Sequence, residues 1–113
     1  MEVQFACKRF PIAQVLRCSF NLTLTEYEVL KLLMRGERSV EELAQRLGKD
    51  RTTVQRAIKP LIAKGLVRRR QYNLSGGGYQ FFYSAVGKER IKQRVNEHFE
   101  HFTRTVRAEI ENW

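Results

Sequence analysis

Three features that define large classes of protein are scarce or absent in this sequence. No apolar stretch approaches the roughly 20 residues that a membrane-spanning helix needs, so we expect no membrane segment. Arg17 interrupts the apolar part of the N-terminal region, which argues against a secretory signal and favours a cytoplasmic protein. The two cysteines, Cys7 and Cys18, are too few for a disulfide framework. We expect reduced, half-buried thiols, with a redox-sensing pair as the alternative.

Recognisable catalytic chemistry is also missing. The sequence has no hydrolytic or nucleotide-binding motif, and no Gly-Lys-Ser/Thr helix start follows Gly76–Gly78, as a phosphate-binding loop would require. We therefore expect no enzyme activity and no cofactor. His98 and His101 are three residues apart and would share a helix face, so a zinc site bridging two subunits is one interpretation. The simpler one is a histidine packed beside Val95 and Phe102.

The whole chain has a net charge of +9, and positions 51–88 contain no acidic residue. The basic residues of this window are Arg51, Arg56, Lys59, Lys64, Arg68, Arg69, Arg70 and Lys88. The remainder of the chain is therefore close to neutral. A run of charge is usually a solvated face, but here it coincides with a helix and a hairpin that can reach one surface. This coincidence favours a polyanionic partner.

Two helix signals precede the basic window. Residues 11–19 have apolar side chains on one helical face, with Pro11 in the first turn. The pattern Thr25-x-x-Glu28 is typical of a capping box, in which each side chain accepts a hydrogen bond from the other residue's amide. The helix that follows, ending at Gly36, is apolar on most sides. It should therefore be the central helix of the core.

Residues 39–64 indicate two helices joined by a tight turn. Ser39-x-x-Glu42 is a second capping box, and the helix after it closes at Gly48. Only one residue separates that glycine from Asp50, a favourable N-cap for a helix from Arg51 to about Lys64. Such a short connection is the geometry of a helix-turn-helix.

The second helix of this pair has two different faces. Val54, Ala57, Ile58 and Leu61 share the face expected to meet the core, and Thr52, Arg56 and Lys59 lie opposite with Gln55 at the edge. Arginine and glutamine can read base edges in the major groove, so this face predicts a DNA-recognition helix. The alternative is an ordinary surface helix with solvated charges. Pro60 predicts a kink or a helix in two pieces.

A basic β-hairpin should follow the helix pair. Residues 66–72 and 79–84 read as strands around the glycine-rich turn 73–78. Tyr79, Phe81 and Tyr83 alternate onto one face, which we interpret as the packing face, although aromatic and basic residues together could also stack on single-stranded bases. We expect the three arginines at positions 68–70 on the other side or at the end.

From about residue 85 onward the chain reads as one long helix. Its apolar residues recur on average near every 3.7 positions and track one side, over roughly 40 Å. They are Ile91, Val95, Phe99, Phe102, Val106, Ile110 and Trp113. Folding back on its own core could cover the first turns but hardly the last four, so we expect a homodimer through this stripe.

Together these residues resemble winged helix-turn-helix regulators over about residues 22–88. The closest likeness is to MarR-like and TrmB-like proteins, with the ArsR group as a relative. The motifs are Leu24–Glu28, the helix Val40–Leu47, the run Arg51–Ile58 and the stop Lys64–Val67. The resemblance implies a dimer with a recognition helix in the major groove and a wing against the minor groove or backbone. The implied DNA contacts are Arg51, Thr52, Gln55, Arg56, Lys59, Arg68, Arg69, Arg70, Ser75, Gly76, Gly77 and Gly78.

The chain also departs from these families. We expect neither the further effector-binding domain of many TrmB-like proteins nor the additional C-terminal helices of MarR-like dimers, whose work a single terminal helix would do. Binding of a small-molecule effector therefore stays open.

We predict a single mainly α domain, 1–113, with a small β-hairpin wing. It would comprise an N-terminal arm and helix (1–21), a winged helix-turn-helix (22–84) and a dimerisation helix (85–113). Its function would be sequence-specific binding of double-stranded DNA as a homodimeric transcriptional regulator. Two alternatives are a non-specific architectural chromatin protein and a protein-interaction winged helix of the transcription machinery.

Overall fold

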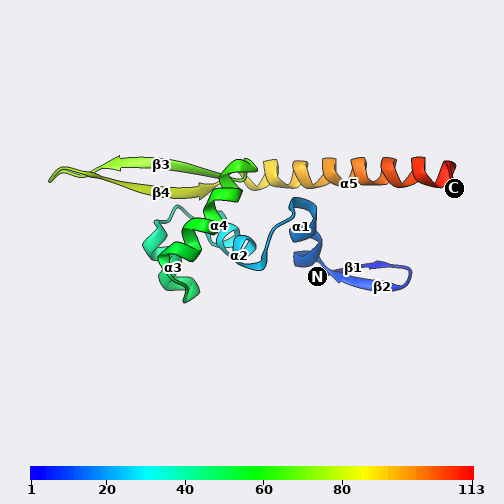
Figure 1. The fold of residues 1–113 in the computed structure, drawn as a ribbon, viewed down its shortest axis with the longest axis horizontal. Coiled ribbons are helices and arrows are strands. Elements are labelled where there is room, and N and C mark those ends of the chain that lie inside the picture. Colours follow the sequence, from blue (N-terminus) through cyan, green and yellow to red (C-terminus); the bar gives the residue numbers. More distant parts are fainter. The chain divides into compact units, whose positions relative to one another are not determined.

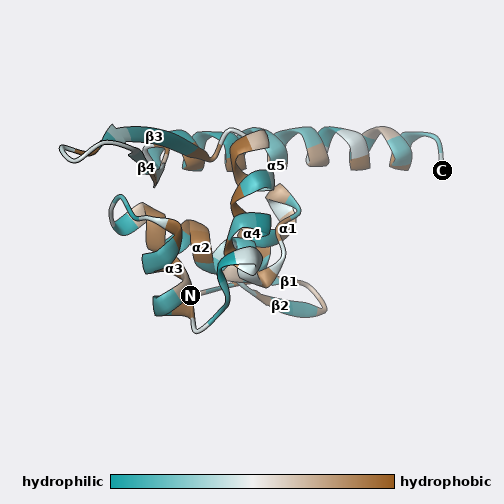
Figure 2. Cartoon of the chain, turned by 60° about the vertical axis from the view of Figure 1, so that its left-hand side comes forward, coloured by the Kyte–Doolittle hydropathy of each residue, from teal (hydrophilic) through white to brown (hydrophobic).

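The computed structural model describes residues 1–113 and contains five helices and two antiparallel hairpins. Figure 1 shows them along the chain, and Figure 2 shows that apolar residues recur in bands along the helices. The elements are β1 (Glu2–Phe5), β2 (Lys8–Pro11), α1 (Ile12–Phe20), α2 (Leu24–Arg35), α3 (Val40–Leu47), α4 (Arg51–Ala63), β3 (Val67–Asn73), β4 (Tyr79–Ala85) and α5 (Lys88–Glu111). The predicted class, mainly α with a β-hairpin wing and a long C-terminal helix, is confirmed.

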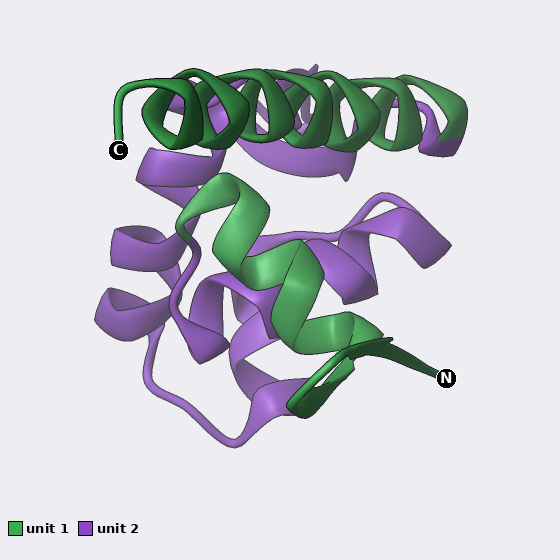
Figure 3. Cartoon of the chain, turned by 90° about the vertical axis from the view of Figure 1, so that its right-hand side faces the viewer, with its two compact units in different colours: residues 1–21, 89–113 green, residues 22–88 purple.

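The chain forms two compact units, coloured separately in Figure 3. The first joins Met1–Asn21 with Glu89–Trp113, and the second is Leu22–Lys88. The predicted winged helix-turn-helix, 22–84, lies within the second unit. The N-terminal segment and nearly all of α5 make up the first.

The core of the second unit is formed by one face from each of its helices and by the residues that flank the wing strands. Its most deeply buried side chains are Leu43, Leu61, Leu66, Val29 and Val54. The face of α4 predicted to meet the core is buried throughout, at Val54, Ala57, Ile58 and Leu61. Burial of that face leaves the opposite face of α4 turned to solvent, as a recognition helix requires.

The caps differ in part from the prediction. The capping box of α2 uses Thr23 and Glu26, each accepting from the other's amide, so the predicted pair at Thr25 and Glu28 is wrong by two residues. At α3 the Ser39 hydroxyl accepts from the Glu42 amide as predicted. The Glu42 carboxylate, however, accepts hydrogen bonds from two arginine side chains instead of completing the box.

The prediction of a helix in two pieces at Pro60 is wrong, because α4 is continuous through this residue. Proline removes one backbone hydrogen bond, the one that would reach the carbonyl of Arg56. Ile58, two residues before Pro60, and Leu61, directly after it, are buried, and the Lys64 amide donates to the Pro60 carbonyl at 2.9 Å. Packing and the remaining hydrogen bonds therefore hold the last turn in place.

The wing is an antiparallel pair with a register running from Val67 opposite Ala85 to Asn73 opposite Tyr79. It is attached to the loop between α2 and α3 in two ways. Arg38 and Tyr83 exchange backbone hydrogen bonds of 2.9 and 2.8 Å. The Tyr72 hydroxyl donates to Glu37 at 2.7 Å, which raises the pKa of that tyrosine. These bonds hold the wing against the helix-turn-helix at the middle of β4, through Tyr83, and near the wing tip, through Tyr72.

In the first unit the segment predicted as a small strand or arm is a complete hairpin, β1–β2. Pro11 is the last residue of β2 and the N-cap of α1, so the helix begins one residue later than predicted. The start of α5 packs against α1, where the Ser19 hydroxyl lies 3.0 Å from Nδ1 of His98. The ring of Phe20 meets His98 edge-on at 5.0 Å.

Candidate nucleic-acid interface

The turn before α4 fixes where its outward face begins. Gly48 ends α3 in the left-handed conformation (φ 64°), which glycine adopts without strain. Asp50 then caps α4 by accepting from the Thr53 amide at 2.7 Å. The hydrogen bonds from the hydroxyl and amide of Thr53 lower the pKa of the Asp50 carboxyl, so it is ionised at neutral pH. Gly48 and Asp50 thus set the path of the chain between α3 and α4.

The predicted reading residues of α4 are all exposed: Thr52, Gln55, Arg56 and Lys59. Arg51 is exposed too, but its guanidinium lies 2.6 Å from the carboxylate of Glu41 on α3. The sequence reasoning missed this ion pair, because Glu41 lies ten residues upstream and outside the acid-free window. Arg51 is therefore partly neutralised, and the uncompensated charge of this face comes from Arg56 and Lys59.

The wing register corrects the predicted placement of its arginines. Residues opposite each other in an antiparallel pair share a face, and Arg69 lies opposite Tyr83. Arg69 therefore lies on the aromatic face, with its guanidinium 4.3 Å from the centre of the Phe81 ring. Arg68 and Arg70 lie on the other face. The prediction that all three arginines avoid the aromatic side is wrong for Arg69, because strand side chains alternate.

The wing tip is uncharged and exposed. Gly77 and Gly78 have φ values of 93° and 82°, a conformation that explains the glycine-rich sequence here. The turn is closed by the Leu74 amide donating to the Gly78 carbonyl at 3.0 Å. Ser75 and Gly76 complete the exposed tip. Tyr79, at the start of β4, is 59% exposed, so this aromatic does not serve only as packing for the wing.

A hollow of about 440 Å³ joins the wing to the helix pair. On the helix side it is lined by Val40, Glu41, Arg51 and Gln55. On the wing side it is lined by Leu74, Tyr79, Gln80, Phe81 and Tyr83. The structure thus brings Arg51 and Gln55 to the same concave surface as the aromatic face that carries Arg69. Arg68 and Arg70 lie on the opposite face of the wing.

The apolar stripe on α5 is covered at its start and open beyond. Ile91 and Val95 are buried. The five stripe residues that follow are exposed: Phe99, Phe102, Val106, Ile110 and Trp113. The side chains of Phe102 and Ile110 are 63% and 60% exposed, so this chain covers little of the later turns of α5.

The remaining candidate residues of the first unit have specific surroundings. His98 packs against α1 as described, whereas His101 is exposed. The structure contains no group of three or more His, Cys, Asp or Glu side chains that could hold a metal ion. Cys7 and Cys18 are exposed, so the expectation of half-buried thiols is wrong. No helix is both long and apolar enough to cross a membrane.

Comparison with known proteins places this geometry in a family. Residues 20–71, which contain α2, α3, α4 and most of β3, match the model of the MarR family. A possible transcriptional regulator from Methanosarcina mazei has the same fold over 100% of this chain and 97% of its own, with 30% identity and a TM-score of 0.89. The chain is a MarR-like winged-helix transcriptional regulator.

Two further relatives of this MarR-like chain extend the comparison. An uncharacterised protein of Methanocaldococcus jannaschii is 41% identical over 91 residues, which cover 80% of this chain and 75% of the relative. The transcriptional regulator BldR from Sulfolobus solfataricus is 26% identical, with a TM-score of 0.55 over 87% of this chain and 68% of its own. The family and the named structural relatives are transcriptional regulators.

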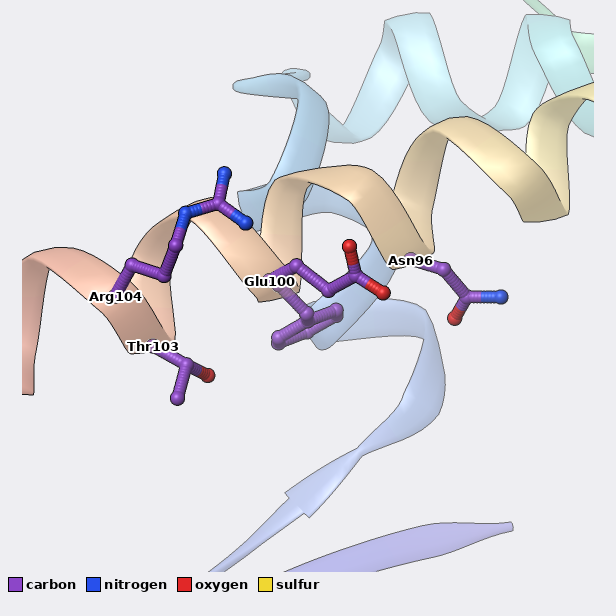
Figure 4. A pocket seen from close by; sticks show the side chains of 5 residues that line it. Asn96, Glu100, Thr103 and Arg104 are labelled. Atoms are coloured by element: carbon purple, nitrogen blue, oxygen red, sulfur yellow. The ribbon is translucent and has the colours of Figure 1, made fainter.

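This MarR-like chain also has a hollow of about 460 Å³ along α5. Figure 4 shows Asn96, Glu100, Thr103 and Arg104 around it, and Phe99 is its fifth lining residue. All five side chains come from one helix, so α5 alone cannot surround a ligand as a small-molecule site does. Only Phe99 of these five belongs to the apolar stripe, so the hollow lies beside that stripe.

Proposed function

We propose that this MarR-like protein is a homodimeric regulator that binds double-stranded DNA in a sequence-specific way. The recognition helix α4 would enter the major groove, and the wing would contact the backbone or the minor groove. The observation that carries the proposal is the outward face of α4. Its four exposed polar residues are of types that pair with base edges, and its other face is held in the core.

The roles within α4 follow from side-chain chemistry. Arg56 can donate two hydrogen bonds to O6 and N7 of guanine, and Gln55 can pair with N6 and N7 of adenine. Thr52 can contact several bases through its methyl or hydroxyl group. Arg51, held by Glu41, and Lys59 suit phosphates on either side of the groove, because their charge attracts the backbone without distinguishing bases.

The wing would add contacts of two kinds. Arg69 lies on the face that borders the same hollow as Gln55, so it suits a phosphate beside the groove that α4 occupies. The tip at Ser75–Gly78 is uncharged, and three of its four residues are glycines, which have no side chain. The tip can therefore approach the sugar-phosphate backbone closely. Such contacts set affinity and register, while α4 sets sequence preference.

The exposed stripe on α5 supports the dimer. A monomer would leave five large apolar side chains in water along one face of a single helix. Pairing through a two-fold axis covers the same stripe on both copies. A symmetric dimer would then read two half-sites about 34–36 Å apart, or a multiple of that distance.

Selection of binding sites from random duplex DNA, followed by footprinting, tests the proposal. We expect a selected palindrome or near-palindrome and a discrete protected region. Diffuse protection without a selected sequence would replace the proposal with a non-specific architectural protein. Weak binding to every duplex, together with a stable protein complex, would favour a protein-interaction winged helix.

A further inference from the structure

The N-terminal hairpin has one apolar face, which its own chain covers only in part. Val3 lies opposite Phe10, and Phe5 lies opposite Lys8, so these four side chains share a face. Val3 is 49% exposed and Phe5 71%. The other face carries Glu2, Gln4 and Arg9. The sequence therefore builds an amphipathic hairpin with its apolar side open.

A hairpin of this size needs a partner surface. Two strands alone are at best marginally stable in water, and each strand here has only four residues. The attachment to α1, including the Ile12 amide donating to the Met1 carbonyl at 3.1 Å, fixes one end of the hairpin. Val3 and Phe5 stay 49% and 71% exposed despite that attachment. Their full burial requires a second surface.

The last turns of α5 offer a surface of matching character. Phe102, Val106 and Ile110 lie exposed along one side of the helix. Glu109 borders them, because it follows Val106 by three residues and precedes Trp113 by four. The apolar face of the hairpin carries a charge of opposite sign, Lys8. Each surface thus has an apolar centre, and Lys8 and Glu109 at their borders are complementary.

We infer that the apolar face of the β1–β2 hairpin packs against the last turns of α5 of a second copy, with Lys8 near Glu109. The inference rests on the proposed homodimer and specifies one of its contacts. In a two-fold arrangement each copy contributes one hairpin and one helix end, so the contact occurs twice. It buries the apolar face of each hairpin, which would stay exposed to solvent if the two copies paired through their α5 helices alone.

The native cysteine at the hairpin turn permits a direct test. Cys7 is exposed, and replacing Cys18 with serine leaves it as the only thiol. In that background Thr103→Cys and Thr105→Cys place a thiol at either edge of the stripe, and Arg104→Cys places one on the opposite side of the same turn. We expect mild oxidation to form a disulfide between Cys7 of one copy and position 103 or 105 of the other, identified by mass spectrometry of the linked peptides.

Three outcomes decide the question. A bond from Cys7 to an edge position, absent in Arg104→Cys and after Cys7→Ser, supports the contact. A dimer in light scattering without such a bond at either edge overturns the hairpin inference and leaves the homodimer intact. A monomer in light scattering contradicts the homodimer itself, and with it the inference.

Substitutions give a second, independent measurement. Phe5→Ser should raise the dimer dissociation constant about tenfold or more, because a ring buried only in the dimer is lost from both contacts. Gln4→Ser, on the polar face, is the matched control and should leave it unchanged. Lys8→Glu and Glu109→Lys should each weaken the dimer, and the two together should restore it. Equal effects at positions 4 and 5, or no restoration by the double change, would overturn the contact.

Discussion

The two faces of the wing should contribute unequally to the salt dependence of DNA binding. Arg69 lies on the aromatic face that borders the hollow shared with Gln55, whereas Arg68 and Arg70 lie on the other face. Each phosphate that a protein neutralises adds about 0.9 to the slope of log K against log salt concentration. A dimer makes each contact twice, so Arg69→Ala should reduce the slope by about 1.8. Arg68→Ala and Arg70→Ala should each reduce it by clearly less.

Fluorescence anisotropy with a labelled duplex, at salt concentrations from about 50 to 200 mM, measures these slopes. Arg69→Lys is the matched control, because it keeps the charge while losing the planar stacking on Phe81. Its slope should stay close to that of the native protein. Equal reductions for all three alanine variants, or an unchanged slope for Arg69→Ala, would refute the assignment of wing faces.

Three further predictions concern stability and assembly. Arg38→Ala should lower the free energy of unfolding by about 2 kcal/mol, because a side chain only 13% exposed loses its bonds to the Leu32 carbonyl and Glu42. Arg46→Ala removes a more exposed partner of the same carboxylate and should cost less than about 0.5 kcal/mol in the same denaturant titration; equal costs would contradict the role of Arg38. The lowered pKa of Asp50 means that its stabilisation is present above its unfolded pKa of about 3.9 and is lost as pH falls through the folded value. Asp50→Asn keeps a capping oxygen, so its stability should fall less steeply than that of the native protein below about pH 4, and parallel acid limbs would rule out this contribution. Phe102→Ser with Ile110→Ser should give a folded monomer by light scattering and circular dichroism, since both side chains are exposed in the single chain; a dimer of unchanged affinity would exclude the α5 stripe as the interface.

The helix-turn-helix could be predicted from the sequence because its signals are local. Ser39 and Asp50 cap helices whose apolar residues follow one period, and Gly48 supplies the left-handed turn between them. These signals fix both the length of α4 and the face it buries. The exposure of Arg56 on the remaining face follows directly.

The start of α2 could not be decided by the same means. Thr23-x-x-Glu26 and Thr25-x-x-Glu28 are both capping-box patterns, and the sequence favours neither. In the structure Leu22 is buried directly before the cap. Its burial in the core selects Thr23, and this choice depends on tertiary packing that a local pattern does not contain.

The ion pair of Arg51 and the split among the wing arginines were missed for related reasons. Strand alternation separates Arg69 from its neighbours, but only the packed register shows which face meets the helices. Glu41 reaches Arg51 only because the tight turn brings α3 beside the start of α4. Both features depend on contacts between segments that are distant in sequence.

Reading of bases by α4 is tested most directly by comparing Arg56→Ala with the native protein on a selected duplex and on a random one. Affinity for the selected duplex should fall by about tenfold or more per half-site, because a bidentate contact to a base is worth about 1–3 kcal/mol. Affinity for the random duplex should change little by comparison. Equal losses on both duplexes would show that Arg56 contacts only the backbone and would rule out its reading of bases.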